Sequence, residues 1–243
     1  MNARMTAAGA DPTGASRRAR KVVLAAAIGC VAIALSDVPG IAQRLPHLVG
    51  DMAGRVTTHA AVPLLLAASG FALALLRYRL TRAPLVIGCV DVVACGLSLA
   101  HAFATAPVVD PTAAPIVRVD AIGAWLPVNL AIALGLAGVA LILLSLRRVE
   151  WLAEVAAASL ATAALFSLRD HAQGLESAIF ASTTRTLPPL ASTALLLLSV
   201  GMLALRVERA VSAGRGRIGT LALPLAVLVA STSVLVASTV QEH

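Results

Sequence analysis

The chain has 243 residues, of which 59% are hydrophobic and 13% charged, and its formal net charge is +7. Ordinary globular domains contain about 45–50% apolar and about 25% charged residues, so this composition argues against a soluble protein. A nucleic-acid partner is not expected either, because the arginines stand at the ends of long apolar runs, as topology signals do.

The apolar runs predict an all-α, polytopic membrane bundle of about seven transmembrane helices. A basic tail at 1–20 precedes this single domain at 21–240, and a short tail at 241–243 follows it. We expect the spans at roughly 21–37, 57–77, 83–105, 122–146, 150–169, 187–206 and 218–240.

The first span, in "RRARKVVLAAAIGCVAIALSD", has two interpretations. Its basic start, apolar core and Ala32–Ile33–Ala34 triplet suit a cleaved signal peptide as well as a permanent helix. We favour the permanent helix, because six further spans already anchor the chain.

The basic residues predict the orientation of the chain in a cell membrane. With the N-terminus in the cytoplasm, 14 of the 19 basic residues fall on the inner side. Positive residues favour the cytoplasm, so the C-terminus is expected outside.

Asp91 is the most unusual residue of the third span, "VIGCVDVVACGLSLAHAF". It lies about eight residues into the span, roughly 12 Å deep at 1.5 Å per residue. Cys95 and Ser98 follow at i+4 and i+7, on the same helical stripe. A buried ionisable group favours either a proton or cation relay and polar switch, or an aspartate that fixes helix packing.

The fourth span, "NLAIALGLAGVALILLSLRR", resembles two others in its pattern. Asn129 opens it, Gly138 follows, and Arg147–Arg148 close it. The same spacing from opening residue to glycine occurs in an earlier and a later span, which contain the sets Ala61, Gly70 and Arg77, and Ser192, Gly201 and Arg206. The pattern predicts parallel repeats of a helical hairpin, in which Asn129 acts as an N-cap and the glycines allow close helix packing. Asn129 is also a candidate ligand or relay residue, together with Asp91, Cys95 and Ser98.

Two further groups of residues begin or flank the later spans. Glu150 and Glu154 lie one turn apart at the inner start of the fifth span, where Arg147 or Arg148 are the expected partners. His59, His101 and His171 belong to different spans but are all expected near the outer face. Histidines at one depth suit a haem or metal site, and they equally suit polar positions among lipid headgroups.

The returning helices resemble the "P-N-T-A-L-x-F-x-L-x-G-x-x-L" helices of the multi-span N-terminal sensor regions of bacterial histidine kinases and diguanylate cyclases. "VNLAIALGLAGVAL" and "STALLLLSVGMLAL" carry this resemblance, which extends over about residues 20–240. It implies a sensory module. The chain has no kinase histidine box, GGDEF-type motif or nucleotide loop, so a stand-alone or truncated relative is expected.

Three functions follow as hypotheses. The first is a non-enzymatic sensory or regulatory module that acts through helix repacking on a membrane or cytoplasmic signalling partner, or on another copy of itself. The second is a haem- or metal-binding membrane subunit that uses the outer-face histidines. The third is a small transporter or channel with Asp91 in its path, and no catalytic motif favours an enzyme.

Overall fold

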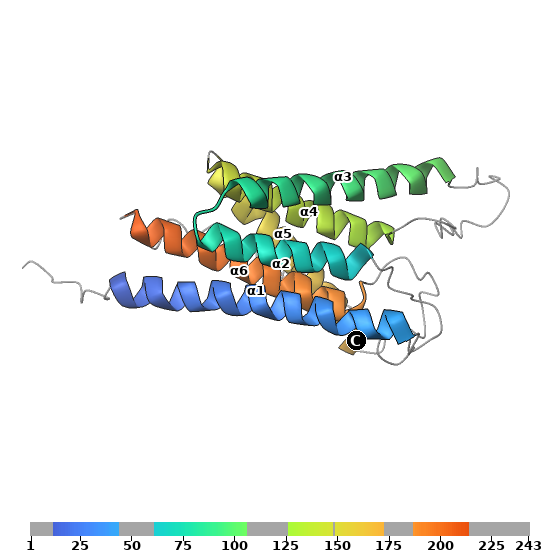
Figure 1. Ribbon diagram of the computed structural model, residues 1–243, viewed down its shortest axis with the longest axis horizontal. Helices are drawn as coiled ribbons and strands as arrows, with labels where there is room; N and C mark the ends of the chain where they lie inside the picture. Colours follow the sequence, from blue (N-terminus) through green and yellow to red (C-terminus); the bar gives the residue numbers. More distant parts are fainter. Residues whose placement is uncertain (1–11, 44–60, 106–125, 148, 173–186, 214–243) are drawn as a thin grey trace, which may run out of the picture.

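The structure is a computed structural model that describes residues 12–43, 61–105, 126–147, 149–172 and 187–213 (Figure 1). Every regular element in these ranges is an α-helix. The helices are α1 (Pro12–Gln43), α2 (Ala61–Arg77), α3 (Arg82–Thr105), α4 (Val128–Leu146), α5 (Glu150–Ala172) and α6 (Pro189–Ser212).

Five of these helices, all except α2, are long and apolar enough to cross a membrane. The 17 residues of α2 extend about 26 Å at 1.5 Å per residue, slightly less than the roughly 30 Å of a bilayer core. The prediction of an all-helical, multi-pass membrane protein is therefore confirmed. The expected span at 218–240 lies outside the described residues.

Proline sets the start of two helices. Pro127 and Pro188 occupy the N-cap positions of α4 and α6, both with φ near −55° and ψ near 140°. This extended conformation keeps each proline outside its helix, so α4 begins at Val128 rather than near 122. By contrast, α1 begins earlier than expected, at Pro12, within the stretch predicted to be a tail.

The helices form an inner and an outer set. The inner helices α2, α4 and α6 contact one another, and each outer helix packs in a groove between two of them. Helix α1 lies between α2 and α6, α3 between α2 and α4, and α5 between α4 and α6. The outer helices share no contact in the described part of the chain, so α2, α4 and α6 hold the bundle together (Figure 1).

The three inner helices bury corresponding positions. When Val62 of α2, Leu130 of α4 and Ala191 of α6 are aligned, each buried position of α2 has a buried counterpart in α4, and each of α4 has one in α6. Large apolar side chains recur at three such levels and belong to one hydrophobic cluster: Leu66, Leu134 and Leu195; Leu73, Leu141 and Met202; Leu76, Leu144 and Leu205. Apolar side chains therefore fill the interior of the bundle.

This register differs from the expected one in the last helix. The correspondence of Gly70 with Gly138 agrees with the buried positions, but the expected correspondence of Gly138 with Gly201 does not. Ser199, not Gly201, stands at the position that corresponds to Gly138. The burial pattern of a whole helix determines this register better than one shared residue type does.

Glycines lie where helices approach closely. A Cβ atom on Gly70 would lie 3.2 Å from the carbonyl oxygen of Ala27 in α1, and one on Gly201 would lie 2.9 Å from Ala26 Cβ. A Cβ on Gly138 would meet Gly88 O of α3 at 2.9 Å. All three glycines remove side-chain volume at helix contacts, as small residues do in membrane proteins.

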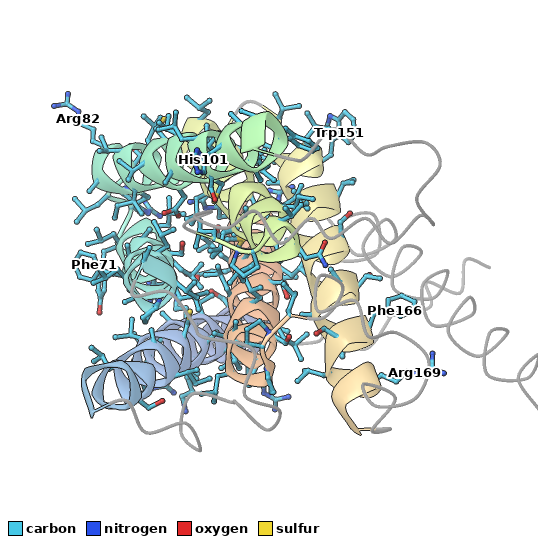
Figure 2. The ribbon with its side chains drawn as sticks, turned by 90° about the vertical axis from the view of Figure 1, so that its right-hand side faces the viewer. Phe71, Arg82, His101, Trp151, Phe166 and Arg169 are labelled. Carbon is cyan, nitrogen blue, oxygen red and sulfur yellow. The ribbon has the colours of Figure 1, made fainter. Side chains whose placement is uncertain are left out.

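Large apolar side chains are exposed on the outward surface of the bundle. Exposed side chains on α3 include Val86, Val90, Val93, Leu97 and Phe103. Phe71 of α2 and Trp151 of α5 project outward in the same manner (Figure 2). Such a surface suits lipid chains, which solvate apolar side chains without a free-energy cost.

Candidate functional site

Asp91 lies in α3, in the groove between α2 and α4, and its side chain is 0% exposed. Ser69 Oγ of α2 donates a hydrogen bond to Asp91 Oδ2 over 2.7 Å. The other carboxyl oxygen, Oδ1, is buried without a hydrogen-bond partner. The carboxyl group thus connects α3 to α2 through one oxygen only.

Glycine makes room for this carboxyl group. A Cβ atom on Gly138 of α4 would lie 2.9 Å from Asp91 Cβ, and one on Gly88 of α3 would lie 2.8 Å from Gly138 O. These distances are shorter than van der Waals contact, so α3 and α4 touch backbone to backbone beside Asp91. The site is close-packed around the carboxyl.

The cost of burying Asp91 depends on its ionisation state. An ionised carboxylate taken out of water costs several kcal/mol, even after the protein relaxes. A buried neutral group with one unpaired oxygen costs about 1–3 kcal/mol. The site therefore discriminates strongly between the two forms of the carboxyl group.

Cys95 and Ser98, the other two residues on the helical stripe of Asp91, make their contacts elsewhere along α3. Cys95 is buried one turn from Asp91, beside Gly135 of α4. Ser98 Oγ donates to Leu126 O over 3.3 Å and accepts from Leu126 N over 3.2 Å. Ser98 thus fixes the chain just before α4, and it does not join Asp91 in one polar site.

Ser167 fixes the chain just before α6 in the same way that Ser98 does before α4. Ser167 Oγ of α5 donates to Leu187 O over 3.0 Å and accepts from Leu187 N over 2.9 Å, while Ser192 Oγ donates to Ser167 Oγ. Sequence reasoning missed both contacts. The shared Leu-Pro dipeptide, at 126–127 and 187–188, is the signal that marks them.

The predicted N-cap role of Asn129 is wrong. Pro127 is the N-cap residue of α4 and makes no side-chain cap hydrogen bond, and Asn129 is the second helical residue. Ser192 likewise lies inside α6, after its N-cap Pro188. Proline displaced the helix start toward the N-terminus from both polar residues, because its fixed φ suits that boundary.

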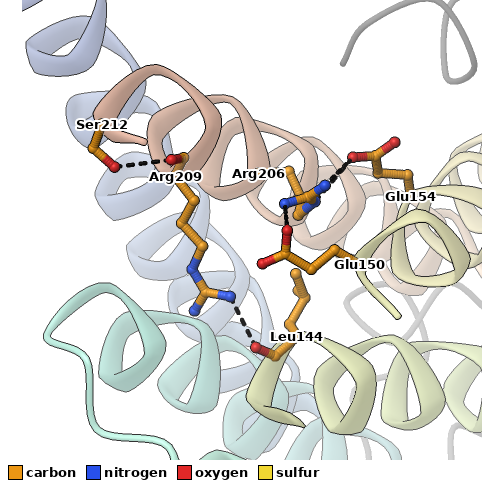
Figure 3. Close-up of polar contacts among 6 residues, drawn as sticks. All are labelled: Leu144, Glu150, Glu154, Arg206, Arg209 and Ser212. Carbon is orange, nitrogen blue, oxygen red and sulfur yellow. Dashed lines mark hydrogen bonds and ion pairs between the residues drawn. The ribbon is translucent and has the colours of Figure 1, made fainter. Parts of the chain in front are cut away.

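Charged side chains join the helices at the end of the bundle where α2, α4 and α6 end (Figure 3). Arg206 of α6 binds Glu150 of α5, and its Nη2 lies 2.6 Å from Glu154 Oε1. Glu154 and Arg206 are both buried. One guanidinium group thus binds two carboxylates, since it offers five donors in a planar fork.

Two neighbours of Arg206 extend this contact to other helices. Arg20 Nε of α1 donates to Glu208 Oε1 over 2.8 Å, and Arg77 Nε of α2 lies 3.6 Å from Glu208 Oε2. Arg209 Nη1 donates to Leu144 O of α4 over 2.8 Å. We call Arg20, Arg77, Glu150, Glu154, Arg206, Glu208 and Arg209 the basic-end network.

Arg147 follows α4 in the left-handed conformation, with φ 54°, and its N–H donates to Leu143 O. Arg148, the second residue of the expected pair, lies outside the described residues. The sequence placed the two glutamates correctly near a helix start, but the structure pairs both with Arg206, 52 and 56 residues away. No local spacing marks such a distant partner.

The described part of the chain brings no metal site together. His101 is exposed on α3 (Figure 2), His59 is outside the described residues, and the side chain of His171 is not described. No group of three or more His, Cys, Asp or Glu side chains that suits a metal ion occurs among the described residues.

Asp91 with Ser69, and the basic-end network, are therefore the two sites in the described part of the chain where a carboxyl side chain bonds another helix. Comparison of the chain with models of protein families, with characterised proteins and with solved structures found no match.

Proposed function

We propose that the chain is a non-enzymatic regulatory module of the membrane, which passes a change of helix packing inside the bilayer to its basic end. One observation carries this proposal: α2 takes part in both polar sites. Its Ser69 binds Asp91 of α3, and its Arg77 reaches Glu208 of α6. The two residues are eight positions apart, about 12 Å along the helix, so a shift of α2 at Asp91 alters the ion pair.

The interior of the bundle supports this function over transport. Nine corresponding apolar residues of α2, α4 and α6 belong to one buried cluster. A transport path needs polar groups or water along its length. The polar contacts of the described residues instead lie between neighbouring helices, at Asp91, at the basic end and at the starts of α4 and α6.

The proposal extends to topology and ancestry. We propose that the basic end faces the cytoplasm, that 218–240 forms a seventh span, and that α1–α2, α3–α4 and α5–α6 are repeats of one hairpin. Two pairs of residues that correspond in the alignment of α2 with α4 support the repeat: Gly70 with Gly138, and Arg79 with Arg147, the latter both left-handed. The resemblance to kinase and cyclase sensor regions supports a signalling partner at the basic end.

Distances between spin labels test the coupling through α2. The labels go on Tyr78→Cys and Ser212→Cys, both exposed at the basic end, in a full-length chain in lipid nanodiscs whose three cysteines are replaced by alanine. Ser69→Ala removes the link to Asp91, and we expect it to shift the distance distribution. Ser145→Ala is the matched control, since that hydroxyl bonds only Leu141 of its own helix.

An unchanged distribution in Ser69→Ala would reject the coupling. A proton or sodium flux into vesicles that Asp91→Asn abolishes would instead establish a transporter.

A further inference from the structure

Among the described residues, no positively charged side chain lies beside Asp91. Among the described helices α3 packs only against α2 and α4. Helix α2 contains no titratable residue before Arg77 at its end, and α4 contains none at all. On α3 itself the nearest titratable side chains are Cys89 and Cys95, while Arg82 and His101 lie nine and ten residues away, about 14 and 15 Å along the helix.

Asp91 also lies close to the middle of the membrane. The apolar span Arg82–Ala104 has its centre at residue 93, two positions from Asp91. Ionisable residues at this depth normally pair with an opposite charge or face water. Asp91 does neither, since it is fully buried and receives one hydrogen bond, from a neutral hydroxyl group.

We propose that Asp91 is a proton-binding site of the membrane interior, occupied in the packed bundle. The proton resides on Oδ1, the oxygen that no donor reaches, while Oδ2 accepts from Ser69. Release breaks the Oδ1–H bond and transfers the proton to a water molecule, leaving the carboxylate. Because Gly88 and Gly138 close the site, water reaches Asp91 only after α3 separates from α4.

This inference deepens the proposed function, because it identifies the proton as the ligand that the interior site binds. Proton occupancy stabilises the packing of α3 against α2 and α4. Loss of the proton places a charge where no partner balances it, so it favours a separated arrangement.

A hydrophobic carbodiimide tests the protonation state. Dicyclohexylcarbodiimide takes the acid proton on one nitrogen, and the carboxyl oxygen adds to its central carbon. The acyl group then migrates to nitrogen, which leaves a stable acylurea adduct with no leaving group. The full chain is treated in nanodiscs at several pH values, and its peptides are analysed by mass spectrometry.

We expect an adduct on Asp91 at neutral pH that decreases as the pH rises. Glu154 and Glu208 are matched controls in the same sample, because both are buried but bind arginine, and they should stay unmodified. Protection of Asp91 by sodium at constant pH would overturn the proposal in favour of a metal-cation site.

Infrared spectroscopy covers the case in which the reagent does not reach the site. The difference spectrum of wild type minus Asp91→Asn should contain the C=O stretch of a protonated carboxyl group at neutral pH. Its absence would overturn the proposal. A protonated Asp91 together with unchanged spin-label distances in Ser69→Ala would reject only the regulatory coupling, so the two failures are distinguishable.

Discussion

At the scale of single residues, two buried serines make the same contact at the starts of α4 and α6. Ser98 and Ser167 bond both backbone groups of the leucine that precedes a cap proline, so they hold the entry to α4 and α6. A proline has no N–H group to donate, so the leucine before it is the nearest preceding residue with both a backbone donor and a backbone acceptor. The serine hydroxyl bonds both of these groups and so fixes the chain just before the helix.

Replacement of Ser167 by alanine should destabilise the protein by about 1–3 kcal/mol, because the two buried hydrogen bonds between its hydroxyl group and the backbone of Leu187 are lost. Unfolding in mixed detergent micelles measures the change. Ser199→Ala is the control, since that hydroxyl bonds only Leu196 of its own helix, and it should have a smaller effect. Equal losses in both variants would contradict the role given to Ser167.

At the scale of helices, the close contact of α3 with α4 depends on Gly88 and Gly138. The corresponding contact between α1 and α2 involves Gly70, whose added Cβ would lie 3.2 Å from both Ala27 O and Cys30 Cβ. In both hairpins a glycine of the returning helix faces the backbone of the outgoing helix. Asp91 and Cys30 occupy the same position relative to that glycine, so only the middle hairpin places a carboxyl group there.

A comparison of Gly138→Ala with Gly135→Ala, on the same helix, distinguishes the effect of side-chain packing on stability from the effect of helix propensity. Alanine favours a helix by about 1 kcal/mol over glycine. At Gly135 the new Cβ would make an ordinary 3.6 Å contact with Cys95, so this variant should be neutral or stabilised. At Gly138 it would clash with Asp91 Cβ and Gly88 O, and we expect a net loss of about 1–3 kcal/mol. Similar unfolding curves for the two variants would exclude tight packing at Gly138.

At the scale of the whole molecule, α6 connects the bundle at its basic end. Arg206 reaches α5, Glu208 reaches α1 and α2, and Arg209 reaches α4. Only α3 receives no contact from these three side chains in the described part of the chain. Helix α3 is held instead by Asp91, by Ser98 and by its glycine contact with α4, so its packing depends on the state of the interior site rather than on the basic end.

Arg206→Met should destabilise the bundle by about 3–5 kcal/mol, because it removes the guanidinium group that binds the buried carboxylate of Glu154. Adding Glu150→Gln and Glu154→Gln should recover most of this loss. Arg20→Met is the control, with an expected loss below about 1 kcal/mol, since the side chain of Arg20 is 51% exposed. Thermal unfolding in nanodiscs measures all three, and no recovery in the triple variant would show that packing of Arg206, not its charge, is what matters.

Much of the fold follows from hydropathy alone. Five membrane-length helices and α2 lie where apolar runs were expected, because the hydrocarbon core of a bilayer can be crossed only by such runs. Helix ends were less predictable, since Pro127 and Pro188 and not the polar residues set them. Asp91 stood out as a lone carboxyl group, but Ser69 lies 22 residues away on another helix, and only the packed structure brings the two together.

Arg79 and Arg147 have a consequence for how the protein is made. Both adopt positive φ just after a helix, at 63° and 54°, in a conformation that glycine adopts freely and that costs other residues about 1–2 kcal/mol. The finished bundle would gain stability from glycine at either place. In the proposed orientation both turns lie on the cytoplasmic side, where the positive charge of the arginines would retain them while the hairpins insert. The backbone strain at the two turns would then follow from membrane insertion and not from the stability of the folded bundle.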